Sequence, residues 1–197
     1  KGKVGKIIDV QDFDTGAIED IRTNPNHFEM TASEYANPAN KGAFVNKLDF
    51  VVLAALEVDT DFNVNVITGS DGVLRGAPGG HPDTAEGAKC CVIVTPLTRG
   101  RMATICEHVV TVTTPGDCVD VVVTDYGTAV NPRRKDIIEA LDAAGIKHVP
   151  IKQLQEKAYS LVGKPDDLQF KDKVVAILEA RDGTILDVVK EIKPFEF

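Results

Sequence analysis

A glycine-rich polar segment stands between two apolar stretches of this chain. It runs from Asp61 to Asp83 and contains five glycines within a dozen residues: Gly69, Gly72, Gly76, Gly79 and Gly80. Glycine allows positive φ angles and lets another molecule approach the main chain closely, so such a loop is suited to binding a substrate. A long surface connection can have the same composition. Glycine content alone does not separate these two interpretations.

Three residues in and beside this loop are candidates for catalysis. Main-chain N–H groups around Gly79 and Gly80 could stabilise a developing oxyanion, as acyl transfer requires. Glu57 ends the preceding apolar run, where a carboxylate could be a base or a nucleophile, or could simply pair with an arginine. We therefore predict Gly79, Gly80 and Glu57 as catalytic residues.

The arginines near the loop indicate an anionic substrate. The chain carries a net charge of −8 with a pI of about 5.0, so it needs a local group of cations to bind an anion. Arginine binds carboxylate or phosphate through two parallel hydrogen bonds, although most charged residues only form a solvated face. Arg133 and Arg134 are secondary candidates. The predicted substrate-binding residues are Arg75, His81, Asn63, Asn65, Arg99 and Arg101.

Metal and disulfide chemistry are not expected. Asp59, Asp61 and Asp83 resemble an acidic cluster, but no histidine or cysteine stands at metal-ligand spacing, so we predict no metal site. The four cysteines contain no CxxC pair and lie in or beside apolar segments. We expect them to be reduced, buried residues of a cytoplasmic protein. They are Cys90, Cys91, Cys106 and Cys118.

The composition is that of an ordinary globular domain, with 43% hydrophobic and 26% charged residues. The acidic charge argues against nucleic acid or an anionic membrane as the main partner. Apolar runs have the length of strands and are too short to cross a bilayer. We therefore expect a single domain over residues 1–197 that binds neither nucleic acid nor membrane.

The pattern of elements predicts an α/β fold. Leu48–Val58 is almost continuously apolar, which is typical of a strand buried on both faces of a parallel sheet. Two segments around Arg181–Gly183 predict an antiparallel C-terminal hairpin. We expect an open, mostly parallel sheet flanked by helices, with this hairpin as its edge. The other predicted strands are Ile7–Val10, Asn63–Thr68, Lys89–Pro96, His108–Thr114, Asp120–Thr124 and Ile146–Pro150. The predicted helices are Thr15–Thr23, a helix capped by Asn131 with Pro132 at its first position and ended by Gly145, and one after Pro150 with Ile151, Leu154, Ala158, Leu161 and Val162 on one apolar stripe.

Several long motifs resemble the citrate lyase alpha subunit family. They extend over most of the chain and include IDVQDFD (Ile8–Asp14), ALEVDTDFNVNVITGSDGVLRGAPGGHPDTA (Ala55–Ala85), PLTRGR (Pro96–Arg101), VTTPGDCVDVVVTDYGTAVNPRR (Val112–Arg134) and ARDGTILDVV (Ala180–Val189). More distantly, the sequence is similar to family I CoA transferases and acetyl-CoA hydrolases. This resemblance implies a CoA-transferase-like fold built from two related halves. Because the chain starts at Lys1 without Met, we expect it to be the C-terminal half of a longer subunit.

The resemblance also implies a reaction and partners. A citrate lyase alpha subunit exchanges the acetyl group of acetyl-S-acyl-carrier protein for citrate, giving the citryl thioester and acetate. The partners implied are the acyl carrier protein, the citryl-lyase subunit and citrate, within an oligomeric complex. The CoA-like prosthetic group belongs to the carrier protein, and we expect no cofactor bound covalently to this chain.

One departure from the family pattern leaves the mechanism open. Many family I CoA transferases use a glutamate in a Glu-x-Gly motif; Glu86-Gly87 is a weak match, and Glu57 is not at the matching position. Either the nucleophile lies outside this chain, or citrate attacks directly through a mixed anhydride, which we favour. Two other functions fit the resemblance: an inactive assembly module, or a CoA-thioester hydrolase of the same fold.

Overall fold

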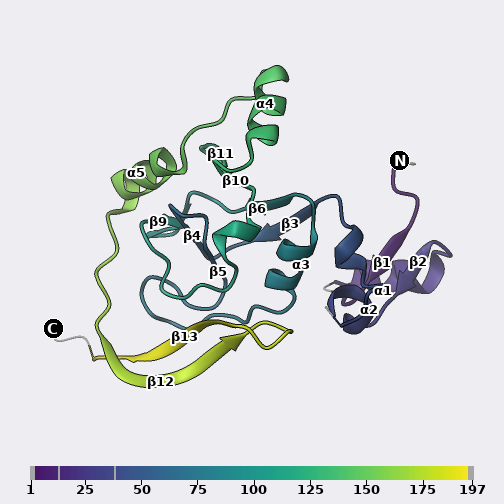
Figure 1. Cartoon of the computed structure of the whole chain (residues 1–197), viewed down its shortest axis with the longest axis horizontal. Coiled ribbons are helices and arrows are strands. Elements are labelled where there is room, and N and C mark those ends of the chain that lie inside the picture. Colours follow the sequence, from purple (N-terminus) through teal and green to yellow (C-terminus); the bar gives the residue numbers. More distant parts are fainter. Residues whose placement is uncertain (1–2, 13, 38, 195–197) are drawn as a thin grey trace.

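The computed structural model describes residues 3–12, 14–37 and 39–194 and has an α/β fold with several small sheets (Figure 1). The central sheet has the strand order β11–β10–β6–β3. Two of its pairings are parallel, β3 with β6 and β6 with β10, while β11 returns antiparallel to β10. No helix within the described ranges is both long and apolar enough to cross a membrane. The strands are β3 (Val51–Ala54), β6 (Cys91–Val94), β10 (Val121–Thr124) and β11 (Gly127–Val130).

The apolar run predicted as one strand forms two strands in different sheets. After β3, the chain leaves the central sheet at Ala55 and enters a second, three-stranded sheet with the order β5–β4–β9. The prediction that this run is buried on both faces was also wrong, because Val52 in β3 is 66% exposed. The new strands are β4 (Glu57–Asp59), β5 (Val64–Asn65) and β9 (Ile105–Cys106).

Two further predicted strands do not form. His108–Thr114 makes only a single bridge, from Thr114 to Val64, and its threonine hydroxyls bond to neighbouring groups instead. Ile146–Pro150 is irregular, although the N–H of Val149 bonds to the carbonyl of Thr128. A β-branched composition therefore did not suffice to make either segment a strand.

The C-terminal hairpin is present, but it is not the edge of the central sheet. β12 (Phe170–Glu179) and β13 (Ile185–Ile192) form a separate two-stranded sheet that runs below the core in Figure 1. Two other small sheets pair β1 (Ile7–Asp9) with β2 (His27–Glu29) in parallel, and β7 (Thr98–Arg99) with β8 (Met102–Ala103) antiparallel. The strand predicted at Ile7–Val10 is thus confirmed, whereas β2 is not among the predicted strands.

The helices agree more closely with the sequence patterns. α1 (Thr15–Thr23) is confirmed, and Asp14 caps it by accepting a hydrogen bond from the N–H of Ala17. α5 (Ile151–Val162) buries Ile151, Leu154 and Ala158 against the core, as predicted. The remaining helices are α2 (Ala32–Ala36), α3 (His81–Gly87), α4 (Lys135–Ala143) and the short 3₁₀ turns η1 (Phe44–Lys47) and η2 (Gly116–Cys118).

The predicted start of α4 was wrong. Asn131 does not cap the helix; its side chain is buried and donates to the carbonyls of Gly116 and Val119. The helix begins three residues after Pro132, with Arg134 at the N-cap. Gly145 follows its end with φ of +68°, as expected of a glycine that terminates a helix.

The hydrophobic core lies between the two larger sheets and α5. Its fully enclosed members include Val58, Ile93, Leu97, Ile105 and Val122. The cysteines are free, three buried and Cys118 half-buried, as predicted. Burial raises the pKa of Cys91 to about 12, so this thiol stays protonated and serves as a small apolar side chain.

Candidate functional site

The glycine-rich segment forms a long loop between β5 and α3 and lies against the C-terminal hairpin. Loop and hairpin together line a groove of about 730 Å³. Its walls are mostly apolar and include Ile67, Leu74 and Pro78 from the loop and Val175 and Val189 from the hairpin. The loop folds back on itself at Gly72, whose φ of +74° favours glycine. The loop is thus one side of a groove, as a substrate-binding loop should be.

The two predicted asparagines hold the base of this loop. The side-chain oxygen of Asn65 accepts the N–H groups of Ile67 and Thr68, both at 3.0 Å. Asn63 donates to Asp59 at 3.1 Å and accepts the N–H of Gly116 at 2.9 Å. Asn65 is fully buried and Asn63 half-buried. Both amides are therefore occupied by the protein itself. Asn65 turns the chain at the end of β5, and Asn63 joins the turn before β5 to Gly116.

Glu57 and Ser70 form a buried pair under the loop. One carboxylate oxygen of Glu57 accepts the N–H of Ser70 at 2.6 Å and also the Ser70 hydroxyl. The other oxygen is buried without a hydrogen-bond partner among the described residues, and the residue is 1% exposed. Burial raises the pKa of Glu57, although the bonds from Ser70 act in the opposite direction. Glu57 thus anchors the loop through Ser70 and is enclosed by protein.

Arg75 and Arg101 both lie near Asp71, one as its ion-pair partner and the other in the same pocket lining. Arg75 makes a two-pronged ion pair with Asp71, with N–O distances of 2.6 and 2.5 Å, which lowers the pKa of that carboxyl. Arg101 lines a pocket of about 200 Å³ together with Ser70, Asp71 and Lys164. Its guanidinium makes no hydrogen bond or ion pair in the part of the chain that the structure describes. Arg101 is therefore the available cation beside the loop.

The other arginines serve the scaffold. Arg99 donates to the carbonyl of Ala55 at 3.1 Å. Arg133 and Arg134 each approach a carboxylate oxygen of Asp120 at 2.8 Å, and Asp120 is 3% exposed. Asp120 also accepts the N–H of Cys91, which joins the edge of β6 to the turn before α4. Each of these three guanidinium groups therefore has at least one protein partner, unlike that of Arg101.

Gly79 and Gly80 lie at the far end of the loop, just before α3. Gly79 has φ of +52°, and a Cβ there would meet no atom within 4 Å. Neither glycine N–H donates to a protein acceptor within the described residues, whereas the next N–H, of His81, bonds to Pro78. Two successive unengaged N–H groups at an open position have the donor chemistry of an oxyanion site.

His81 is enclosed behind these glycines. Its Nδ1 lies 2.7 Å from the Thr114 hydroxyl, and its Nε2 lies 3.0 Å from the carbonyl of Ala54. Burial lowers the pKa of His81, so the ring is neutral, with Nε2 donating and Nδ1 accepting. Both nitrogens are thereby occupied by protein groups that fix α3 to β3.

Sequence reasoning did not find Ser70, Asp71 or Lys164. Ser70 and Asp71 lie in the glycine segment, where their spacing from Glu57 and Arg75 gives no signal until the loop folds back. Lys164 comes from the connection after α5 and forms an ion pair with Glu107 at 3.0 Å. Among the acidic residues of the predicted cluster, Asp59 bonds to the N–H groups of Asp61 and Asn63, and Asp83 pairs with Arg181.

Comparison with known proteins extends the resemblance from the individual motifs to almost the whole chain. The family model for citrate lyase, alpha subunit, matches residues 1–192. This chain belongs to that family. The citrate lyase alpha chains of Haemophilus influenzae (strain ATCC 51907 / DSM 11121 / KW20 / Rd) and Escherichia coli (strain K12) are 54% and 53% identical to it over 98% of its length. The chain spans 38% of the length of each of these relatives.

Solved structures agree with this family assignment. The putative alpha subunit of citrate lyase from Streptococcus mutans, solved in complex with citrate, is 51% identical with a TM-score of 0.92. That comparison covers 98% of this chain and 38% of the other. A mutant of RipA shares the fold, with 21% identity, a TM-score of 0.52, and coverage of 75% of this chain and 35% of its own.

Proposed function

We propose that this chain carries the citrate-binding and acyl-transfer residues of a citrate:acyl-carrier-protein transferase. The observation that carries the proposal is the Streptococcus mutans relative in complex with citrate, because its likeness extends over almost all of this chain. The partners would be citrate, the acyl carrier protein with its CoA-like group, and the citryl-lyase subunit. Cytoplasmic oligomers would be the working form.

The binding half of the proposal rests on the loop between β5 and α3. Citrate carries three carboxylates, and Arg101 is a cation with no protein partner among the described residues. Arg75 is held in place by its ion pair with Asp71. Arg101 would contact a citrate carboxylate first. Arg75 would either turn from Asp71 to the citrate or contact both carboxylates. Arg99, Asn63, Asn65 and His81 would act by holding the loop, since their polar groups are already bonded.

The transfer half of the proposal uses the main-chain donors at Gly79 and Gly80. A citrate carboxylate oxygen attacks the carbonyl carbon of the acetyl thioester, the C–S bond breaks, and the carrier thiolate leaves. The thiolate then attacks the citryl carbonyl of the mixed anhydride, and acetate leaves. Each attack places negative charge on a carbonyl oxygen, which the two N–H groups would stabilise.

Glu57 enters this proposal as the residue that anchors Ser70. A glutamyl nucleophile must reach the thioester carbon, but this carboxylate is 1% exposed and bonded to Ser70. Enclosure of Glu57 favours the direct attack by citrate over a covalent glutamyl intermediate at this position. Glu57→Gln should therefore retain acyl exchange. Loss of exchange at unchanged citrate affinity would instead favour a covalent glutamyl intermediate at Glu57.

An open apolar face gives the assembly-module function independent support. Phe50, Val52 and Val94 are 70%, 66% and 46% exposed on and beside one face of the parallel part of the central sheet. Parallel sheets are normally covered on both faces. A docking partner on this face would explain an exposed surface of this kind.

Calorimetric titration with citrate, and separately with acetyl-CoA in place of the carrier thioester, tests the first proposal. We expect citrate to bind and Arg101→Ala to weaken binding by about tenfold, the loss of one charge-assisted contact of about 1.5 kcal/mol. Lys157→Ala is the control, since this lysine does not line the Arg101 pocket and its ammonium lies over the ring of Tyr126. Absence of citrate binding, with stabilisation by a partner subunit alone, would favour the assembly module. Release of free acid without an acceptor would favour the hydrolase.

A further inference from the structure

The first strand pair holds a buried histidine between carboxylates, away from the glycine loop. His27 opens β2 and pairs in register with Ile7 of β1, while α1 connects the two strands. Its side chain is 2% exposed. Its Nε2 lies 2.8 Å from an oxygen of Asp9, and its Nδ1 lies 2.9 Å from an oxygen of Asp20. Both ring nitrogens of a fully buried imidazole therefore face acidic groups.

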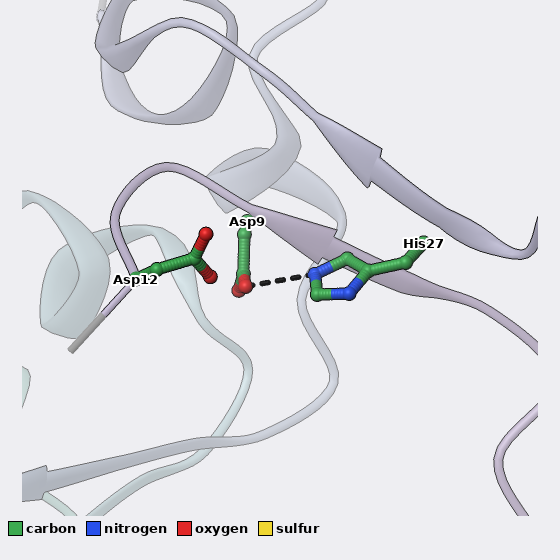
Figure 2. A group of neighbouring side chains, drawn as sticks. All are labelled: Asp9, Asp12 and His27. Carbon is green, nitrogen blue, oxygen red and sulfur yellow. Dashed lines mark hydrogen bonds and ion pairs between the residues drawn. The ribbon is translucent and has the colours of Figure 1, made fainter. Parts of the chain in front are cut away.

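A third carboxyl group completes the cluster from the other side of Asp9. Figure 2 shows Asp12 pointing toward Asp9, which in turn points toward His27. One oxygen of Asp12 is buried without a hydrogen-bond partner among the described residues. Two carboxyl groups in contact need a proton or a cation between them. A buried oxygen without a donor is an unsatisfied acceptor that a cation would satisfy.

The protonation of the cluster in the absence of an ion follows from these contacts. Burial opposes charge on the imidazole, but the hydrogen bonds to Asp9 and Asp20 outweigh it and raise the pKa of His27. The contact with Asp9 raises the pKa of Asp12, while Asp12 and His27 lower that of Asp9. The pKa values of His27 and Asp12 thus shift in the direction that favours their protonated forms.

We propose that Asp9, Asp12 and His27 bind one divalent transition-metal ion of the Zn²⁺ type. The three donor atoms, one from each residue, all lie within 4.8 Å of one another. A tetrahedral zinc ion needs its ligand atoms about 3.3 Å apart, so small side-chain rotations bring them into place. A divalent ion supplies the positive charge that two carboxyl groups in contact require. The side chain of Asp9 is 31% exposed, which leaves a path for the ion and for a water ligand.

Asp20 gives the site the outer contact that metal-bound histidines usually have. It accepts from Nδ1 of His27, which leaves Nε2 as the atom directed at Asp9 and Asp12. Asp20 is itself held by the side chain of Asn24 at 3.1 Å. An imidazole ligand favours zinc and its neighbours over Mg²⁺ and Ca²⁺, which prefer oxygen alone. The bound ion would join β1, the turn before α1, and β2.

Zinc titration of the chelator-treated chain, in a buffer that does not bind metals, tests the proposal. We expect one ion per chain, bound more weakly as pH falls, because zinc and protons compete for the same ligand atoms. Asp12→Asn is the sharpest variant, because Asn resembles the protonated Asp12 and preserves the ion-free cluster. It should leave the melting temperature without zinc unchanged and weaken zinc binding by about tenfold or more, while Asp20→Asn weakens it by about 10- to 100-fold.

Two controls separate this site from other ligands. His148→Gln removes an exposed histidine that contacts one carboxylate, Asp142 at 3.0 Å, and should leave zinc binding unchanged. X-ray absorption should show zinc–nitrogen and zinc–oxygen distances of about 2.0–2.1 Å and no sulfur at about 2.3 Å, which excludes the cysteines. Binding that survives both Asp12→Asn and His27→Gln, no binding at millimolar zinc, or equal competition by Mg²⁺ would each overturn the proposal.

Discussion

Replacing Glu57 by Gln isolates the charge of a buried carboxyl group beneath the glycine loop. The folded chain encloses this group, and burial raises its pKa above the ordinary value of 4.5. The folded state therefore holds the proton more tightly than the unfolded state. As pH rises from the ordinary carboxyl range through the raised pKa, the native protein loses stability, because Glu57 must ionise where water does not reach it.

Gln keeps the volume of Glu57 and the acceptor for Ser70, but it does not ionise. Near pH 4, where Glu57 is protonated, we expect the two proteins to unfold with free energies within about 1 kcal/mol, since the amide N–H group stands where the acid has its O–H. Between the unfolded and folded pKa values, the wild type loses about 1.4 kcal/mol per pH unit relative to the variant. Glu57→Gln should therefore become the more stable protein toward pH 8.

Urea unfolding of both proteins from pH 4 to pH 8 measures this difference directly. Other titrating groups are common to the pair, so they cancel in the comparison. Glu19→Gln is the matched control, because its side chain is 61% exposed and should change stability by less than about 0.5 kcal/mol at every pH. A difference that does not depend on pH would refute the burial argument. A variant that loses stability relative to wild type as pH rises would mean that Ser70 stabilises the carboxylate more than burial opposes it.

Two substitutions in the scaffold should destabilise the fold, whereas their control substitutions should change its stability little. Gly116→Ala should cost about 2–3 kcal/mol in denaturant unfolding, because its Cβ would overlap the carbonyl oxygen of Asp61, whereas Gly80→Ala meets nothing closer than 3.6 Å and should cost less than about 0.5 kcal/mol. Equal effects would contradict the close approach. Asp120→Ala should cost about 3 kcal/mol by leaving Arg134 and the N–H of Cys91 without their buried partner, while the exposed pair partner Asp142→Ala should change little. A near-neutral Asp120→Ala would show that water replaces the carboxylate.

The sequence predicted local elements well where residues close in sequence determine them. α5 has its apolar residues at helical spacing and buries Ile151, Leu154 and Ala158, although Leu161 is exposed, and the β12–β13 hairpin forms around Asp182 and Gly183. Side chains that bond to distant backbone groups explain the failures. Asn131 stands where a helix cap is expected, but its side chain donates to the carbonyls of Gly116 and Val119. No local sequence pattern indicates these two contacts.

The same reasoning explains the division of the apolar run 48–58. Its composition favours one long strand, but composition does not say where a strand leaves a sheet. β4 is held by parallel pairing with β9, almost fifty residues later, and by the antiparallel return of β5. Such pairing is a long-range property, so the sequence identified strand-forming residues and missed the sheet to which they belong.

The candidate site residues fall into two groups. In one group the polar atoms already bond to the protein, and in the other they do not. Residue type suggested Arg99 and Arg101 equally, yet one guanidinium bonds to the carbonyl of Ala55 and the other faces a pocket. His81 was suggested by its place after two glycines, but its ring is enclosed by groups from β3 and Thr114. A substrate recruits at least cost the groups that the fold has left without partners. Of the predicted residues, the guanidinium of Arg101 and the main-chain N–H groups of Gly79 and Gly80 have no protein acceptor among the described residues. These donors, more than the buried polar residues around them, should decide how tightly an anion binds to this chain.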